Sequence, residues 1–339
     1  TGHASKASST IALYIQGQNK TKSEMTINQL TLESTGFGVY QKAVNDSQAN
    51  LTLRDVTVTS VPAYAFSAYT SEGETNSSHI RLEGRLSLPA DSYIATGVGK
   101  GTWIETDLTQ TSLSGDVDME DGARFTLGLS APTATANLHL TNALTPANPA
   151  TIEVNLKNGG RWSAIGEPSH INSITFASRG ALDLRQVTLP EPETAPTTDA
   201  ETTMARSAPM LRAAAVTPDP TVTDSTAGDP ATPTTTPIPA SLVTNEWLGT
   251  DGLITLTVNT QTNEGQVLEI VERSEGNHTL DIQNQSDQQP TGMPILLVRS
   301  VNGLTHPEAY TATFKEAQPV EVGELKYYVG NSTMVNEEA

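Results

Sequence analysis

The residues best suited to chemistry form a short acidic run, Asp116-Val117-Asp118-Met119-Glu120. In a strand, alternate side chains share a face, so Asp116, Asp118 and Glu120 would point the same way. Such carboxylates suit a hard cation, and paired carboxylates also supply the acid and base of polysaccharide-cleaving enzymes. The alternative is a solvated acidic turn, because the spacing is not that of an EF-hand loop. The run is therefore one cation candidate, without a defined metal site.

Other catalytic signatures are missing from the sequence. The six histidines form no His-Glu-x-x-His motif, which argues against a zinc hydrolase. No Gly-x-Ser-x-Gly nucleophile elbow occurs. The chain has no cysteine, so disulfides, thiolate metal sites and cysteine nucleophiles are excluded. These observations predict a protein that is not an enzyme and needs no cofactor.

Aromatic side chains offer a second kind of site, a stacking surface for sugars. Tyr40, Tyr64 and Tyr69 lie near expected turns, where a ligand surface and ordinary packing are both open. The three tryptophans could contribute to the same surface. A tryptophan within an apolar, alternating strand usually packs in the core, so Trp162 is expected to be structural.

The charge balance restricts the partners. The chain of 339 residues has 19 Lys and Arg against 38 Asp and Glu, a net charge of −19. Such a surface repels phosphate backbones and anionic headgroups, so nucleic acid and membrane surfaces are not expected to bind. No apolar run reaches the roughly 20 residues of a membrane span, and residues 1–10 lack the features of a signal peptide. We therefore expect a segment of a larger product that does not insert into a membrane.

The elements that must position these residues are short strands. Apolar residues alternate with polar ones over and over, with Gly, Asn, Asp, Ser and Pro between the groups, and no long segment keeps a helical period. The pattern predicts an all-β protein. Its clearest groups are Ile27/Leu30/Leu32, Leu51/Leu53, Ile80/Leu82, Phe125/Leu127/Leu129, Leu138/Leu140, Ile152/Val154/Leu156, Ile174/Phe176 and Leu182/Leu184.

The spacing of these strands favours a right-handed parallel β-helix over a β-sandwich, which remains the alternative fold. In the C-terminal part, the expected strands recur every 12 to 15 residues, and two such strands would make one rung. In the N-terminal part, Leu51 follows Ile27 by 24 residues and Ile80 follows Leu51 by 29, which predicts whole rungs with long loops. The segment 295–298 is expected to be a buried rung strand next to Ile282 and Phe314. The C-terminal strands are expected near Ile254, Leu268, Leu280, Ile295, Tyr310 and Leu325.

One segment interrupts the strands. Residues 190–240 contain ten of the twenty prolines, in a context of Thr, Ala and Asp. Such a composition buries too little apolar surface to offset the entropy of ordering. We expect a flexible Pro/Thr/Ala-rich loop or linker over residues 190–241.

Two regions resemble the passengers of bacterial autotransporters. The run 152–162, with its strand, Asn158-Gly159 turn and Trp162, resembles a rung of the pertactin-like and AIDA-type adhesins. Residues 253–328 are similar, in strand order and spacing, to the C-terminal autochaperone region of these passengers. The family's Asp-x-Leu strand is replaced here by Gln266-Val267-Leu268, and its following Gly stands before the strand, at position 265.

The resemblance implies an organisation and a function. Residues 1–189 would form the rungs of the passenger, 242–331 a C-terminal cap that promotes folding and export, and 332–339 a tail towards a β-barrel translocator beyond the chain end. The passenger would be displayed at the bacterial cell surface or secreted, as an adhesin or structural stalk. Its partner would be a host surface protein or glycan, or the same protein on neighbouring cells. A polysaccharide lyase or hydrolase built on the β-helix is the alternative. Residues expected to support the fold are Trp162, Leu268, Leu280, Leu297 and Tyr328.

Overall fold

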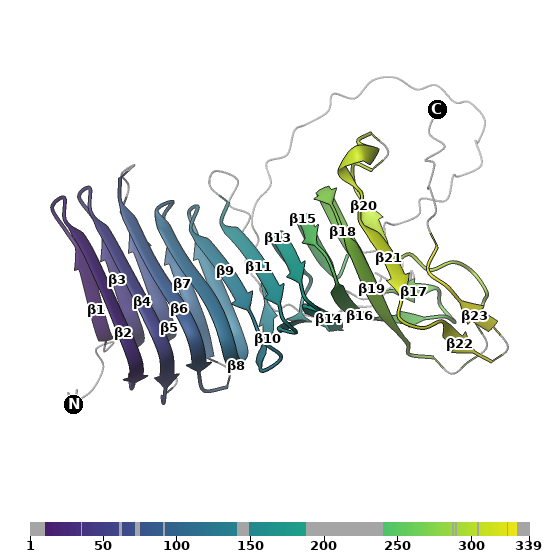
Figure 1. The fold of residues 1–339 in the computed structure, drawn as a ribbon, viewed down its shortest axis with the longest axis horizontal. Helices are drawn as coiled ribbons and strands as arrows, with labels where there is room; N and C mark the ends of the chain where they lie inside the picture. The colour runs from purple at the N-terminus through teal and green to yellow at the C-terminus, as the bar shows by residue number, and fades with distance from the viewer. Residues whose placement is uncertain are drawn as a thin grey trace, which may run out of the picture. The chain divides into compact units, whose positions relative to one another are not determined.

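The computed structural model describes residues 11–140, 149–187 and 240–330, except 35, 61–62, 72–74, 91, 287, 289, 304 and 324. In these ranges the chain is nearly all strand, with one short 3-10 helix, η1 (Pro307–Ala309), and no α-helix. Strands of successive rungs pair in parallel (Figure 1), so the predicted all-β fold and parallel β-helix are confirmed. The described part contains no helix long and apolar enough to cross a bilayer. The predicted loop at 190–241 lies outside the described residues except for its last two positions.

Three parallel ladders of strands build the solenoid. In the described ranges, ladder 1 occurs in the N-terminal rungs and ends on the C-terminal part of the long strand β8. The rungs up to β8 therefore have three strand segments each, and two are described in each of the rungs that follow. Ladder 1 consists of β1 (Ile11–Gly17), β3 (Phe37–Ala43), β5 (Tyr64–Thr70), β7 (Ser92–Val98) and the end of β8 (Thr102–Glu120).

Ladder 2 runs from the first described rungs to the last ones. Its strands pair in sequence from β2 to β20 and pass through the first part of β8. They are β2 (Lys22–Leu32), β4 (Gln48–Val58), β6 (Ser77–Ser87), β9 (Arg124–Leu129), β11 (Thr151–Lys157), β13 (Ser169–Ala177), β15 (Leu242–Gly249), β18 (Leu268–Ser274) and β20 (Val298–Ser300).

Ladder 3 begins at the C-terminal ends of β2, β4 and β6 and continues through the middle of β8. Beyond β8 it has strands of its own, which pair in the same parallel manner. These are β10 (Ala134–His139), β12 (Arg161–Gly166), β14 (Ala181–Val187), β16 (Gly252–Asn259), β19 (Asn277–Asn284) and β21 (Thr313–Glu316).

A bend, or corner, inside a strand allows its two halves to pair in different ladders. Gln29, Asp55 and Gly84 occupy equivalent places in β2, β4 and β6, and each has a left-handed backbone, with φ of 58°, 53° and 78°. The Asp55 side chain supports the corner, because its Oδ1 accepts a hydrogen bond of 3.0 Å from the backbone N–H of Arg85. The rungs thus contain an extra strand segment where the sequence predicted a long loop.

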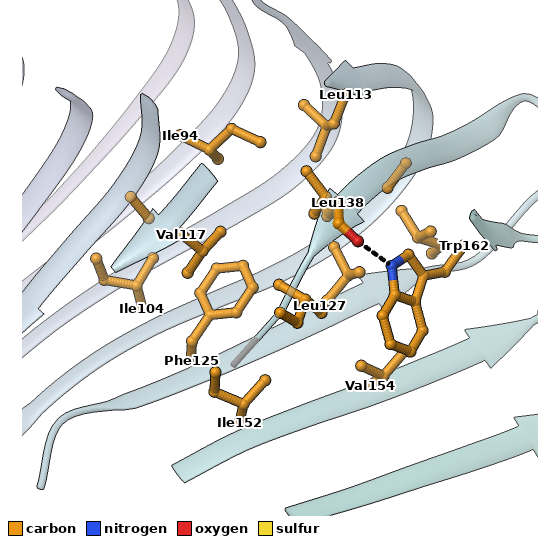
Figure 2. Packing of buried hydrophobic residues seen from close by; sticks show 14 of the residues in the cluster. Ile94, Ile104, Leu113, Val117, Phe125, Leu127, Leu138, Ile152, Val154 and Trp162 are labelled. Carbon is orange, nitrogen blue, oxygen red and sulfur yellow. Dashed lines mark hydrogen bonds between the residues drawn. The ribbon is translucent and has the colours of Figure 1, made fainter. Parts of the chain in front are cut away.

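The core is a set of stacked apolar columns inside the ladders (Figure 2). One column in ladder 2 passes through Leu51, Ile80, Ile104, Phe125 and Ile152, which follow one another in register and are at most 1% exposed. Burying a side chain of this size stabilises the fold by about 1.5–3 kcal/mol. Each rung therefore gains its stability from the rungs on either side, as in other solenoids.

The C-terminal end departs from the predicted pattern in two places. The strand expected near Leu325 is β23 (Leu325–Tyr327), which pairs antiparallel with β22 (Val320–Val322) in a separate two-stranded sheet and is not a rung. The strand expected at 295–298 starts only at Val298, which pairs with Leu268 of ladder 2. Ile282 and Phe314 belong to ladder 3, so the predicted neighbours were wrong. A short strand, β17 (Glu264–Gly265), also folds back antiparallel on β16.

Candidate ligand surface

Aromatic side chains of successive rungs meet on the outward side of ladder 1. Tyr14 of β1 is in register with Tyr40 of β3, and Phe37 of β3 with Tyr64 of β5. Paired strands lie about 4.8 Å apart, so rings at equivalent positions stack along the ladder. Tyr93 of β7 contacts Tyr64 and extends the line by one rung. We call these five side chains the aromatic row.

The rings of the aromatic row are in direct contact. The ring centroids of Tyr14 and Tyr40 are 5.7 Å apart, and those of Phe37 and Tyr64 are 6.1 Å apart, with nearly parallel planes in both pairs. Tyr64 and Tyr93 are 5.2 Å apart and tilted by 55°. These separations are typical of favourable aromatic pairs. The two ends are the most accessible parts, since Tyr14 is 49% and Tyr93 48% exposed.

The acidic run forms the next rung beyond the row. Val117 and Met119 of β8 are buried, whereas Asp116 and Glu120 are exposed and Asp118 is half-buried. The three carboxylates thus share the outward face of a strand, and the turn begins only after them, at Asp121. The carboxylates do not converge on one point. Within the described ranges, no group of three or more His, Cys, Asp or Glu side chains is placed to hold a metal ion.

The acidic strand and the aromatic row are joined. Tyr93 is in register with Asp116, and the Tyr64 hydroxyl donates a long hydrogen bond, 3.4 Å, to Oδ2 of Asp118. Burial raises the pKa of Tyr64, and the negative charges of Asp118 and Glu120 raise this pKa further. The phenol therefore remains protonated and available as a donor. Rings and carboxylates form one continuous outward surface.

The three tyrosines singled out in the sequence are divided by the structure. Tyr40 and Tyr64 belong to the aromatic row, and burial, together with neighbouring Tyr14 and Tyr69, raises the pKa of Tyr40. Tyr69 lies towards the other end of β5, in register with Lys42 of β3. The Lys42 ammonium sits 5.2 Å from the centre of the Tyr69 ring, as a cation–π contact.

The tryptophans do not provide free stacking faces. Trp162 and Trp247 are fully buried, so the predicted structural position of Trp162 matches its place in the core. Trp103 faces outward, but its ring is stacked 4.3 Å from His79 and has the Arg124 guanidinium 4.7 Å from its centre. Burial lowers the pKa of His79, with Glu105 acting in the opposite direction.

The remaining residues expected to support the fold lie at the C-terminal end. Leu268 and Leu280 are buried in ladders 2 and 3. Leu297 is half-buried and packs against the core, and the Leu268 N–H donates a hydrogen bond to its carbonyl oxygen at 2.9 Å. Tyr328 is instead 65% exposed, so it does not fill the core.

Tyr328 lines a groove of about 270 Å³ at this end, with Val258, Ile282, Leu297 and Val320 among its neighbours. Within the described ranges no carboxylate or imidazole lines this groove, and its ionisable side chains are the phenols of Tyr327 and Tyr328. Its surface is therefore mainly apolar.

The sequence did not reveal Tyr14, Phe37 and Tyr93 as members of the surface. The signal was present in the spacing: Tyr14 and Tyr40 are 26 residues apart, Phe37 and Tyr64 are 27 apart, and Tyr64 and Tyr93 are 29 apart. Each interval is one rung, as the register of the strands shows. Aromatic residues repeating at the rung length would have predicted the row.

Comparison with models of known protein families gives a match in the C-terminal part of the chain. Residues 222–337 match the family model of Pertactin, which covers about a third of the chain. No curated protein matches the chain significantly. The matched segment includes the C-terminal rungs and contains the stretch 253–328 in which the sequence already resembled this family. The match and the parallel solenoid together fit a pertactin-like autotransporter passenger, so the predicted resemblance is confirmed.

Proposed function

We propose that this chain is an adhesive autotransporter passenger at the bacterial cell surface, and that the aromatic row with its acidic end is its contact surface. The observation that carries the proposal is the contact of five aromatic side chains across four rungs on the outside of the solenoid. The apolar cluster inside the solenoid contains none of these five rings, so they are not part of the core. Exposed, contiguous aromatic surface is typical of interaction sites.

The positions of the acidic groups favour binding over catalysis. A glycosidase holds two carboxyl groups on opposite sides of the bond it cleaves. Asp116, Asp118 and Glu120 instead project from one face of a single strand, and the apolar C-terminal groove has no carboxylate. This arrangement supports an adhesin or stalk more than the alternative of a polysaccharide-cleaving enzyme.

Residues 242–331 are proposed to promote folding and export. The strands before residue 188 and after residue 239 pair directly, β13 with β15 and β14 with β16. A folded C-terminal block would therefore offer two open strand edges on which the preceding rung could form, which suits the stepwise growth of a solenoid. We further propose that a β-barrel translocator follows the chain and brings it to the cell surface.

The adhesive function can be tested with the full chain on an array of glycans, matrix proteins and this protein itself. The variant Tyr14→Ser/Tyr93→Ser removes both exposed ends of the row, and Tyr328→Ser removes an even more exposed ring outside it. We expect the double variant to lose at least roughly tenfold in affinity for the captured ligand, and Tyr328→Ser to bind normally. Equal binding by all three proteins, or no binding by any of them, would exclude the row as an adhesive surface.

A further inference from the structure

Ion pairing differs sharply between the two outward surfaces of the solenoid. On ladder 2, carboxylates pair with arginines, in most cases of the neighbouring rung. On ladder 1, the three carboxylates of the acidic strand have no ion-pair partner within the described ranges. The arginine–carboxylate pairs of ladder 2 are Arg54–Glu83 (2.7 Å), Arg81–Glu83 (2.6 Å), Arg81–Glu105 (3.7 Å), Arg124–Glu153 (2.6 Å), Arg273–Glu246 (2.8 Å) and Arg299–Glu269.

The unpaired carboxylates lie beside rings that suit cations. Asp116 is in register with Tyr93, and Asp118 accepts the hydrogen bond of Tyr64. Aromatic faces attract ammonium and guanidinium groups, and outward rings of this protein already do so, Tyr69 with Lys42 and Trp103 with Arg124. Negative charge and aromatic surface therefore lie side by side here. Within the described ranges, neither the acidic strand nor the aromatic row is paired with a cation of the protein itself.

We infer that the aromatic row and the acidic strand bind an extended, arginine- or lysine-rich polypeptide segment. This inference rests on the proposed adhesive function and specifies its partner. The complementarity is one of charge and of spacing. Asp116, Asp118 and Glu120 occupy alternate positions of β8, about 6.6 Å apart along the strand. An extended ligand with a basic residue at every second position repeats at the same interval, so each cation meets one carboxylate.

A neutral glycan fits the surface less well. A neutral ligand would leave the three carboxylates uncompensated in a chain whose net charge is −19. A cationic partner removes this repulsion, and its association is expected to be accelerated by the field of the protein.

Fluorescence anisotropy with the full chain tests the inference directly. The probe is a labelled twelve-residue peptide in which Arg and Thr alternate. The variant Asp118→Asn/Glu120→Gln removes two charges from the surface, and Glu272→Gln/Glu275→Gln removes two exposed charges in and just after β18. Melting curves of the three proteins verify that each is folded.

We expect the first variant to bind the peptide at least roughly tenfold more weakly and the second to change the affinity by less than about threefold. Equal losses would show general attraction to an acidic protein and would overturn the inference. So would unchanged binding by the first variant.

The array experiment separates this inference from the proposed function. Loss of array binding in Tyr14→Ser/Tyr93→Ser, but not in Asp118→Asn/Glu120→Gln, would preserve the adhesive function and exclude a cationic partner. Selective peptide binding without any array ligand would preserve the cationic site and count against the adhesive function.

Discussion

Trp162 donates its indole N–H to the carbonyl oxygen of Leu138, 3.0 Å away, inside the solenoid (Figure 2). Trp162 belongs to β12 and Leu138 to β10, so the bond joins two rungs of ladder 3 from within the core. Both the ring and the Leu138 side chain are fully buried. The largest core side chain of this region thus also satisfies a polar group that water cannot reach.

The first prediction concerns this bond. Trp162→Phe keeps an aromatic ring but leaves the Leu138 carbonyl without its indole donor, which should lower the free energy of unfolding by about 1–3 kcal/mol. Urea unfolding followed by circular dichroism measures the change. Trp103→Phe is the control, because it breaks a similar bond, to Thr126 at 3.1 Å, on the half-buried outside and should cost less than about 1 kcal/mol. Equal losses would contradict a special role for the buried bond.

The second prediction concerns the corner between ladders 2 and 3. Gly84 has φ of 78°, and a Cβ added there would lie 2.8 Å from Oδ1 of Asp55. Gly84→Ala should therefore lower the free energy of unfolding by about 1–3 kcal/mol, through backbone strain and displacement of the Asp55 side chain. Gly166→Ala isolates the strain, since Gly166 has φ of 72° but no atom within 4 Å of the added Cβ. A larger loss for Gly166→Ala would refute the proposed contact.

The strands were predictable from the sequence because alternation is a local property. The groups Leu51/Leu53 and Ile152/Val154 fall in strands, with each inward residue buried. The ladder that a strand joins was harder to predict. The corners at Gln29 and Asp55 shift the apolar alternation by one residue, as from Leu53 to Val56, but one shifted step does not show that the strand passes into another ladder.

The same limit explains the errors at the C-terminal end and at the candidate surface. Val298 pairs with Leu268 of ladder 2 and not with the ladder of Ile282. The position of a strand within its rung decides which strand it pairs with, and the local sequence does not encode that position. Tyr14 and Tyr93 are linked to the aromatic row only by the strand register and by ring contacts between rungs. Residue type indicated which side chains could form a surface, and only the strand pairing showed which ones do.

The third prediction concerns pH. His278 is buried among Phe176, Trp247 and Phe314, and its Nε2 lies 3.0 Å from the carbonyl oxygen of Glu275. Burial lowers the pKa of His278, against the opposing effect of this hydrogen bond. The unfolded chain therefore takes up a proton, near the usual pKa of about 6.5, before the folded chain does. Its contribution to stability is present above that pH and is lost as the pH falls through the lower, folded pKa.

We therefore expect the free energy of unfolding to fall between pH 7.5 and 5.5, and to fall less in His278→Phe. Urea unfolding at the two pH values gives the comparison. His306→Gln, which removes a histidine whose side chain is 65% exposed, serves as the control. An identical slope in His278→Phe and the unaltered protein would show that His278 does not carry this pH dependence.

The last prediction concerns the segment before β20, in which the adjacent residues Leu296 and Leu297 are both half-buried. Leu297 packs against the core, whereas Leu296 does not contact the apolar cluster. Leu297→Asp should cost about 2 kcal/mol, because a carboxylate would replace apolar contacts in a half-buried position, and Leu296→Asp less than about 1 kcal/mol. Leu297→Asn shows how much of the loss is due to charge. Thermal unfolding of the three variants measures these losses. If Leu296→Asp were as destabilising as Leu297→Asp, the inward side of this segment would be assigned incorrectly. The last rung of ladder 2 would then pack differently from the one described.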